Sequence, residues 1–120
     1  MQTQSLIAAL LLSVAAMAHA ADVKKSGGML VTSDGMTVYT FDKDSADSGK
    51  SACAGPCTGL WPAVTTADTG LKAPYGSIKR DDGSMQLTYK GKPLYRYSGD
   101  KKAGDASGDN FKDIWHAVKD

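Results

Sequence analysis

Along most of the chain, apolar and polar residues alternate in short runs, as they do in half-buried β-strands. Tyr39 and Phe41 fall on one face of such a run while Val38 and Thr40 fall on the other, because successive strand side chains point to opposite faces. No run after the first twenty residues shows a convincing helical period. These patterns predict strands over 29–33, 36–41, 77–80, 85–89 and 92–97, with shorter extended pieces around 61–65 and 112–118.

Glycine follows a polar residue between several of these runs. Asp34-Gly35, Asp82-Gly83 and Lys90-Gly91 each separate two extended segments, as hairpin turns require, because glycine accepts a positive φ without steric cost. The chain has 13 glycines, and all of its 13 acidic residues are aspartates, which favour turns over helix interiors. The sequence therefore predicts many turns and short strands.

The chain contains two copies of one unit. Residues 35–41 match residues 91–97 at an offset of 56, with the glycine, the tyrosine and the second aromatic residue in the same places. Further matches are Met29 with Met85, Thr32 with Thr88, Asp44 with Asp100, Trp61 with Trp115, and 23–25 with 78–80. Repeat one is expected over about 22–66 and repeat two over about 77–119, with 67–76 as a linker. Two such units predict one small all-β domain, antiparallel and pseudo-symmetric.

The first twenty residues form a segment of a different kind. The run from Leu6 to Ala18 is almost unbroken in its apolar character but is too short for a bilayer, which needs about 20 apolar residues. It ends in Ala18-His19-Ala20, the small-x-small pattern that signal peptidase recognises. We expect 1–20 to be a cleavable signal peptide. The mature domain, 21–120, is then periplasmic or secreted, with no stable membrane insertion.

The charges of the chain nearly balance. Lysine and arginine total 14 against 13 aspartates, which gives a formal net charge of +1. A dedicated nucleic-acid or anionic-membrane binder would carry a basic excess, so the composition argues against both classes of partner.

The motifs in combination resemble a known family. A Tyr-x-aromatic-x-x-Asp motif occurs over 39–44 and again over 95–100, Cys53-Ala54-Gly55-Pro56-Cys57 precedes Trp61-Pro62, and a segment rich in glycine and aspartate leads to Trp115-His116. This set is similar to a bacterial family of secreted repeats of unknown function, often lipoproteins. The chain differs from many such proteins because no cysteine that could accept a lipid closely follows the apolar run. The resemblance implies an exported location and a β fold, and it implies no reaction.

Cys53 and Cys57 are the only cysteines. In an exported chain they favour a structural disulfide that pins the segment before Trp61. A redox-active dithiol or a soft-metal site is the alternative, although thioredoxin-like motifs place two residues between their cysteines and this pair has three.

His116 is the sole histidine after cleavage of the signal, and a strand-end residue with one hydrogen bond is its expected role. Thioether and imidazole ligands together suit copper, so Met29, Met85 and His116 are candidate ligands of a metal site. Core packing explains the methionines equally well, because methionine fills irregular gaps.

Aspartates in two matching loops, 42–47 and 100–109, are candidate ligands of a calcium site, because calcium prefers oxygen ligands. Their order is not that of an EF-hand and lysines lie among them, so we expect solvated loops and no cofactor.

Aromatic residues form the strongest candidate cluster. If the repeats pair symmetrically, Tyr39, Phe41 and Trp61 meet their counterparts Tyr95, Tyr97 and Trp115. Rings of this size dominate small cores, so a core is expected. The alternative is a groove for a sugar, a peptide or an aromatic ligand, flanked by the motif aspartates Asp44 and Asp100.

No paired catalytic groups are apparent in the sequence. We therefore expect a non-enzymatic binding or scaffold module of the cell envelope, with an unknown protein or glycan partner. A homodimer is a further alternative, because an exposed strand edge could pair with a second copy of the chain. The competing hypothesis is periplasmic handling of copper or of redox equivalents.

Overall fold

The computed structural model describes residues 22–119, so the expected signal peptide and its cleavage site lie outside the described residues. Three small antiparallel sheets form the fold. They consist of β1 (Val23–Ser26) with β2 (Met29–Thr32), β3 (Tyr39–Phe41) with β7 (Trp115–Ala117), and β4 (Tyr75–Lys79) with β5 (Met85–Tyr89) and β6 (Lys92–Pro93). A one-turn helix, α2 (Cys57–Leu60), precedes Trp61. No helix within 22–119 is long and apolar enough to cross a membrane.

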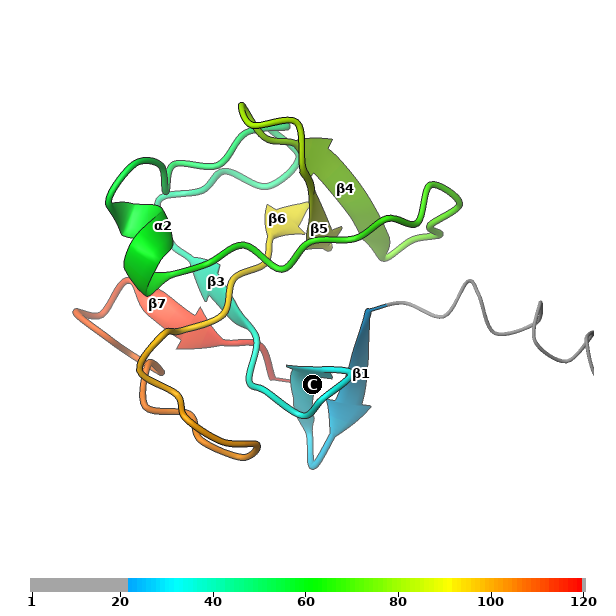
Figure 1. Cartoon of the computed structure of the whole chain (residues 1–120). Coiled ribbons are helices and arrows are strands. Elements are labelled where there is room, and N and C mark those ends of the chain that lie inside the picture. Colours follow the sequence, from blue (N-terminus) through cyan, green and yellow to red (C-terminus); the bar gives the residue numbers. More distant parts are fainter. Residues whose placement is uncertain (1–21, 120) are drawn as a thin grey trace, which may run out of the picture.

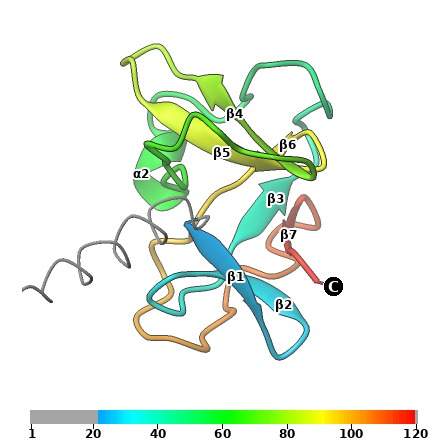
Figure 2. The same ribbon diagram turned by 90° about the vertical axis from the view of Figure 1, so that its right-hand side faces the viewer.

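The sheets are stacked along one direction of the molecule. The β1–β2 hairpin and the β4–β5–β6 sheet lie at opposite ends, with β3 and β7 between them (Figure 1). The same order is seen from the side in Figure 2. The prediction of a small, antiparallel all-β domain built from two repeats is confirmed.

The two repeats are joined at a pseudo-two-fold axis between Tyr39 and Tyr95. The backbone N–H of Tyr39 donates to the carbonyl of Tyr95 at 2.8 Å, and that of Tyr95 donates back to Tyr39 at 2.9 Å. Such a reciprocal pair of bonds between repeat equivalents is what a two-fold relation produces.

Each repeat also contributes the segment after its tryptophan to the other repeat. Val64 of repeat one accepts from Leu87 at 2.8 Å and donates to Leu94 at 3.0 Å. In repeat two, Val118 correspondingly accepts from Leu30 at 2.9 Å and donates to Val38 at 3.0 Å. Neither repeat therefore completes its own backbone hydrogen bonds. Both also contribute to one apolar core, which contains Val23, Leu30, Val38, Val64, Leu87, Tyr89 and Leu94.

The observed strands are shorter than the predicted ones. The predicted strand over 36–41 divides because Thr37 pairs with Val31, whereas β3 pairs with β7. The strand predicted over 92–97 divides in the same way into β6 and a bridge at Tyr95. In both repeats the chain changes its strand partner around a fully buried residue, Val38 in repeat one and Leu94 in repeat two. Each predicted strand is therefore divided into two shorter paired segments.

The first strand of each repeat differs from the prediction. β1 was not predicted, and its lysines Lys24 and Lys25 are exposed. β4 begins at Tyr75, within the predicted linker 67–76. In the two hairpins, Thr32 pairs with Val23 and its repeat equivalent Thr88 pairs with Gly76. The structural equivalent of 23–25 is therefore 76–78 and not 78–80. The match by sequence was wrong because the two hairpin turns differ in length.

The repeats differ in length at two loops. Two residues separate the paired ends of β1 and β2, Ser26 and Met29, whereas five residues separate the paired ends of β4 and β5, Lys79 and Met85. The second difference lies between the motif aspartate and the tryptophan of each repeat. The offset between the repeats is 56 at the aspartates and 54 at the tryptophans, so this segment is two residues longer in repeat one. The longer segment contains both cysteines.

Candidate functional site

The repeated motif forms two buried hydrogen bonds between the repeats. The hydroxyl of Tyr39 donates to Oδ2 of Asp100 at 2.6 Å, and the hydroxyl of Tyr95 donates to Oδ2 of Asp44 at 2.6 Å. Both tyrosines are fully buried, and both aspartates are less than a tenth exposed. Each motif tyrosine therefore bonds the motif aspartate of the other repeat.

The other oxygen of each aspartate orders a loop of its own repeat. Oδ1 of Asp44 accepts the backbone N–H of Ala52 at 2.6 Å. Oδ1 of Asp100 accepts the backbone N–H and the hydroxyl of Ser107, at 2.9 and 2.6 Å. Ser51 lies at the offset of 56 from Ser107, and its hydroxyl is 2.5 Å from that of Tyr95. The sequence analysis missed both serines, although the repeat offset aligns them.

Burial sets the protonation of the two motif tyrosines. Loss of hydration, followed by the hydrogen bond to Asp100, raises the pKa of Tyr39 well above its ordinary value. Loss of hydration, followed by the bond to Asp44, raises the pKa of Tyr95 in the same direction. Both hydroxyls therefore keep their protons at neutral pH and act as structural donors.

The candidate aromatic residues form one stack through the centre of the fold. Phe41 stacks on Trp115 at 4.0 Å between ring centroids, Trp115 on Trp61 at 3.8 Å, and Trp61 on Tyr97 at 4.4 Å. The stack thus alternates between the repeats. Phe41, Trp61 and Trp115 are buried, as are Tyr39 and Tyr95, and Tyr97 is partly buried. Five of these six rings are therefore part of the buried core.

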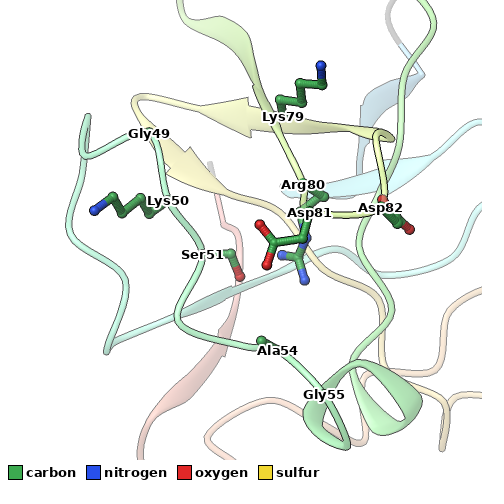
Figure 3. A pocket seen from close by; sticks show the side chains of 9 residues that line it. All are labelled: Gly49, Lys50, Ser51, Ala54, Gly55, Lys79, Arg80, Asp81 and Asp82. Atoms are coloured by element: carbon green, nitrogen blue, oxygen red, sulfur yellow. The ribbon is translucent and has the colours of Figure 1, made fainter.

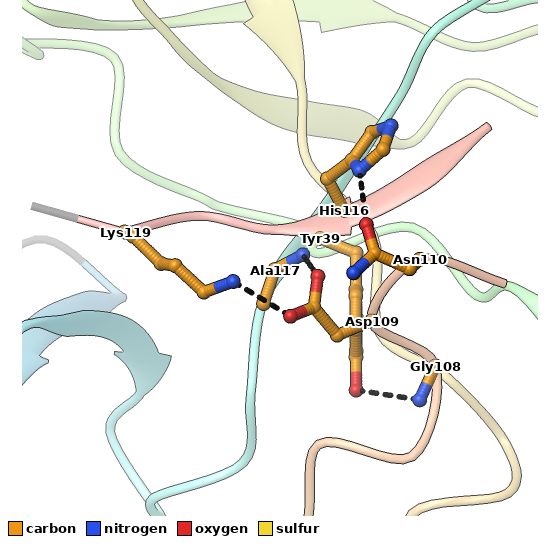
Figure 4. Close-up of polar contacts among 7 residues, drawn as sticks. All are labelled: Tyr39, Gly108, Asp109, Asn110, His116, Ala117 and Lys119. Carbon is orange, nitrogen blue, oxygen red and sulfur yellow. Dashed lines mark hydrogen bonds and ion pairs between the residues drawn. The ribbon is translucent and has the colours of Figure 1, made fainter. Parts of the chain in front are cut away.

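Gly108 allows the loop before β7 to lie against this stack. A Cβ at this position would be 2.7 Å from a carbon of the Trp61 ring, closer than packed carbons approach. Its backbone N–H donates to the hydroxyl of Tyr39 at 3.2 Å (Figure 4). The absence of a side chain therefore lets this segment reach the motif tyrosine.

The candidate metal ligands lie in three different sheets. Met29 is in β2 and packs against the aromatic cluster, Met85 is in β5, and His116 is in β7. The imidazole of His116 is bonded on both sides, with Nε2 2.8 Å from Asp42 Oδ2 and Nδ1 3.1 Å from Asn110 Oδ1. The second of these bonds is drawn in Figure 4. Within residues 22–119, His, Cys, Asp and Glu side chains form no group of three placed to hold a metal ion.

Asp109 ties the loop before β7 to the last strand. Its carboxylate accepts the ammonium of Lys119 at 2.6 Å and the backbone N–H of Ala117 at 2.9 Å (Figure 4). The bond from Lys119, followed by that from Ala117, holds the pKa of the Asp109 carboxyl below its usual value. This aspartate therefore holds the loop before β7 against the last strand.

Cys53 and Cys57 form a disulfide, as predicted. Cys53 is fully buried beside the aromatic cluster, and Cys57 begins α2. The bond closes the loop immediately before Trp61, so it limits the freedom of the segment that supplies one of the two central rings of the stack.

Reduction of the disulfide should lower the free energy of unfolding by about 2 kcal/mol, because so short a loop gains little closure entropy when it is opened. Urea unfolding of residues 21–120 with and without dithiothreitol measures this difference. A loss of more than about 4 kcal/mol would mean that the bond does more than constrain the unfolded chain.

A cleft of about 430 Å³ lies where the disulfide loop meets the turn between β4 and β5 (Figure 3). Residues 49–51 and 54–55 line one side, and 79–82 line the other. These are the two loops in which the repeats differ in length. The corresponding loop of the opposite repeat is shorter in each case, so the cleft lies where the two repeats differ.

Arg80 is held in place on one wall of the cleft. Its Nη1 donates to Oε1 of Gln86 at 2.8 Å, and its Nη2 donates to the carbonyl of Cys53 at 2.8 Å. Gln86 is fully buried and is itself fixed by a bond from Nε2 to the carbonyl of Leu94 at 2.7 Å. The guanidinium therefore has a defined position, facing the loop that carries Ser51.

Among residues 22–119, no carboxylate forms an ion pair with Arg80. The salt bridges within residues 22–119 are those of His116 with Asp42 and of Lys119 with Asp109. Lys50 and Lys79 also line the cleft but extend outward from it, while Asp81 places its carboxylate on the same side as the guanidinium (Figure 3).

The sequence analysis missed Arg80 and Gln86. The available signal was a break in the repeat, since Gln86 takes the place of buried Leu30, and Arg80 lies in the longer turn. A buried polar residue at a position that its repeat equivalent fills with leucine needs a hydrogen-bonding partner, and Arg80 supplies it.

Comparison with known proteins identifies the repeats. A family model described as a secreted repeat of unknown function matches residues 20–65 and again residues 76–119. Neither the curated proteins nor the solved structures contain a significant match. The match covers most of the chain and coincides with the two motif-bearing units, so the chain belongs to this family of secreted repeats of unknown function and carries two copies of the repeat.

Proposed function

We propose that this protein is a non-enzymatic binding module of the cell envelope and that the cleft at Arg80 is its ligand site. The observation that carries the proposal is a guanidinium fixed by two buried acceptors, without a carboxylate partner within 22–119, on the wall of a cleft of about 430 Å³. Small-molecule sites have volumes in this range.

The chemistry of the cleft favours a small carboxylate or phosphate. Arginine carries five N–H donors, and Arg80 uses two of its nitrogens on protein acceptors. The remaining donors suit the paired oxygens of a carboxylate or phosphate, which bind a guanidinium fork in a bidentate manner. Asp81 and Asp82 also line the cleft, so a ligand of low net charge is favoured over a polyanion.

The state of the ionisable groups supports a binding role over catalysis. The motif tyrosines are buried, keep their protons and donate to aspartates. Both nitrogens of His116 are engaged with Asp42 and Asn110. A general acid or base has to exchange its proton with a substrate, and these groups are occupied by the protein itself.

Titration of the mature protein with acetate, succinate and inorganic phosphate, followed by amide NMR, tests the proposal. We expect saturable shifts at Ser51, Gly55 and Arg80, at least tenfold weaker binding in Arg80→Gln, and unchanged binding in Lys101→Gln, which removes an exposed cation outside the cleft lining. Shifts that survive Arg80→Gln would place the ligand elsewhere. A copper ion retained by the purified protein and lost in Met85→Ala and His116→Ala would replace the proposal with metal handling.

A further inference from the structure

We propose that a second copy of this chain is a binding partner, because repeat two of one molecule can take the place of repeat two in another. The result is a dimer with exchanged repeats. This inference goes beyond the proposed ligand site and does not depend on it.

The contacts that join the repeats are the ones that an exchange would preserve. They comprise the bonds of Tyr39 with Asp100 and of Tyr95 with Asp44, the reciprocal backbone bonds of the two tyrosines, and the ring stack. The segments at Val64 and Val118 complete the backbone bonding of the opposite repeat. All of these contacts require one repeat of each kind, and none requires that both belong to the same chain.

A short exposed segment connects the repeats. Residues 67–74 join the pairing segment at Thr66 to the start of β4 at Tyr75, and most of them are exposed. Leu71 packs only in part against the core, and Pro74 accepts one backbone bond, from Lys90. Opening this segment therefore loses few contacts.

Within one chain, the linker keeps the second repeat at an effective concentration in the millimolar range. The exchanged dimer should therefore be populated when the protein is refolded near that concentration, or when the linker can no longer close within one chain. It would carry two Arg80 clefts, each with 49–55 from one chain and 79–82 from the other.

The first test shortens the linker in the full chain. Thr66 and Tyr75 flank β5 on opposite sides, next to Met85 and Tyr89, which places them about 16 Å apart. Deleting 68–72 leaves three linker residues, whose four steps span at most about 14 Å. Closure within one chain would then pull Thr66 or Tyr75 out of its pairing position, so we expect a folded dimer by light scattering. A folded monomer would overturn the proposal.

A second test keeps the linker intact, since the deletion variant can fail to fold. Thr40 and His116 face each other in the β3–β7 register, at a separation that suits a disulfide. Thr40→Cys and His116→Cys chains, mixed, unfolded and refolded together near millimolar concentration, should form a 40–116 disulfide between chains, identified by peptide mapping. The control replaces His116→Cys with Ser77→Cys, an exposed position in another sheet. Cross-linking between chains no greater than in the control would refute the exchange.

Discussion

Asp100→Ala is expected to lower the free energy of unfolding by about 3 to 5 kcal/mol, and Asp44→Ala by a similar amount. The buried carboxylate of Asp100 accepts from Tyr39 and twice from Ser107, and bonds to a charged group are worth more than neutral ones. Its removal leaves the buried Tyr39 hydroxyl without an acceptor. Urea unfolding measures both variants against Asp42→Ala, an exposed aspartate that should cost no more than about 1 kcal/mol.

A double-mutant cycle tests whether the bond between Tyr39 and Asp100 joins the two repeats. Combining Tyr39→Phe with Asp100→Asn should reveal a coupling of about 1 to 3 kcal/mol, whereas Tyr39→Phe with Asp44→Asn, the motif aspartate of its own repeat, should be nearly additive. The matched pair Tyr95→Phe with Asp44→Asn should reproduce the first coupling. Strong coupling within one repeat, or none between repeats, would contradict the reciprocal arrangement.

The sequence predicted the equivalence of the repeats but not how they contact each other. An offset of 56 shows that Tyr39 corresponds to Tyr95 and Asp44 to Asp100, and this is equally consistent with a bond within each repeat or between them. Only the three-dimensional path decides, since each chain segment after a tryptophan crosses to the opposite repeat at Val64 or Val118. Sequence periodicity describes one element at a time and does not specify its partner.

The strands and the candidate site were predictable to different degrees. β2 and β5 carry clear apolar patterns and were predicted, whereas β1 consists of a buried valine followed by exposed polar residues and has no such pattern. The Arg80 cleft depends on two loops that break the repeat, the disulfide loop and the longer β4–β5 turn. A repeat offset identifies the positions that the two halves share, whereas the cleft lies where they differ.

Raising the pH above 10 should destabilise the fold steeply. In the unfolded chain, Tyr39 and Tyr95 lose their protons near the ordinary pKa of 10.0. In the folded protein, burial and the bonds to the aspartates raise the pKa of both, so they stay protonated. The unfolded state then binds two fewer protons than the folded state. Stability is fully present below pH 10 and falls above it by about 2.7 kcal/mol per pH unit.

The slope of this loss separates the two motif tyrosines from other groups that titrate in the same range. Because Phe does not ionise, Tyr39→Phe should reduce the slope above pH 10 by about 1.4 kcal/mol per pH unit relative to the unsubstituted protein, and Tyr95→Phe should do the same. The double variant should lose both contributions, although it starts from a lower stability at pH 8. Urea unfolding at a series of pH values between 8 and 12, with tyrosinate absorbance followed in the folded state, provides the measurement.

The contradicting outcome is a pH slope of the unfolding free energy that is the same in the double variant as in the unsubstituted protein. It would mean that the motif hydroxyls ionise as easily in the folded protein as in the unfolded chain. The motif tyrosines would then be open to solvent, and the reciprocal bonds to Asp44 and Asp100 could not be what joins the two repeats.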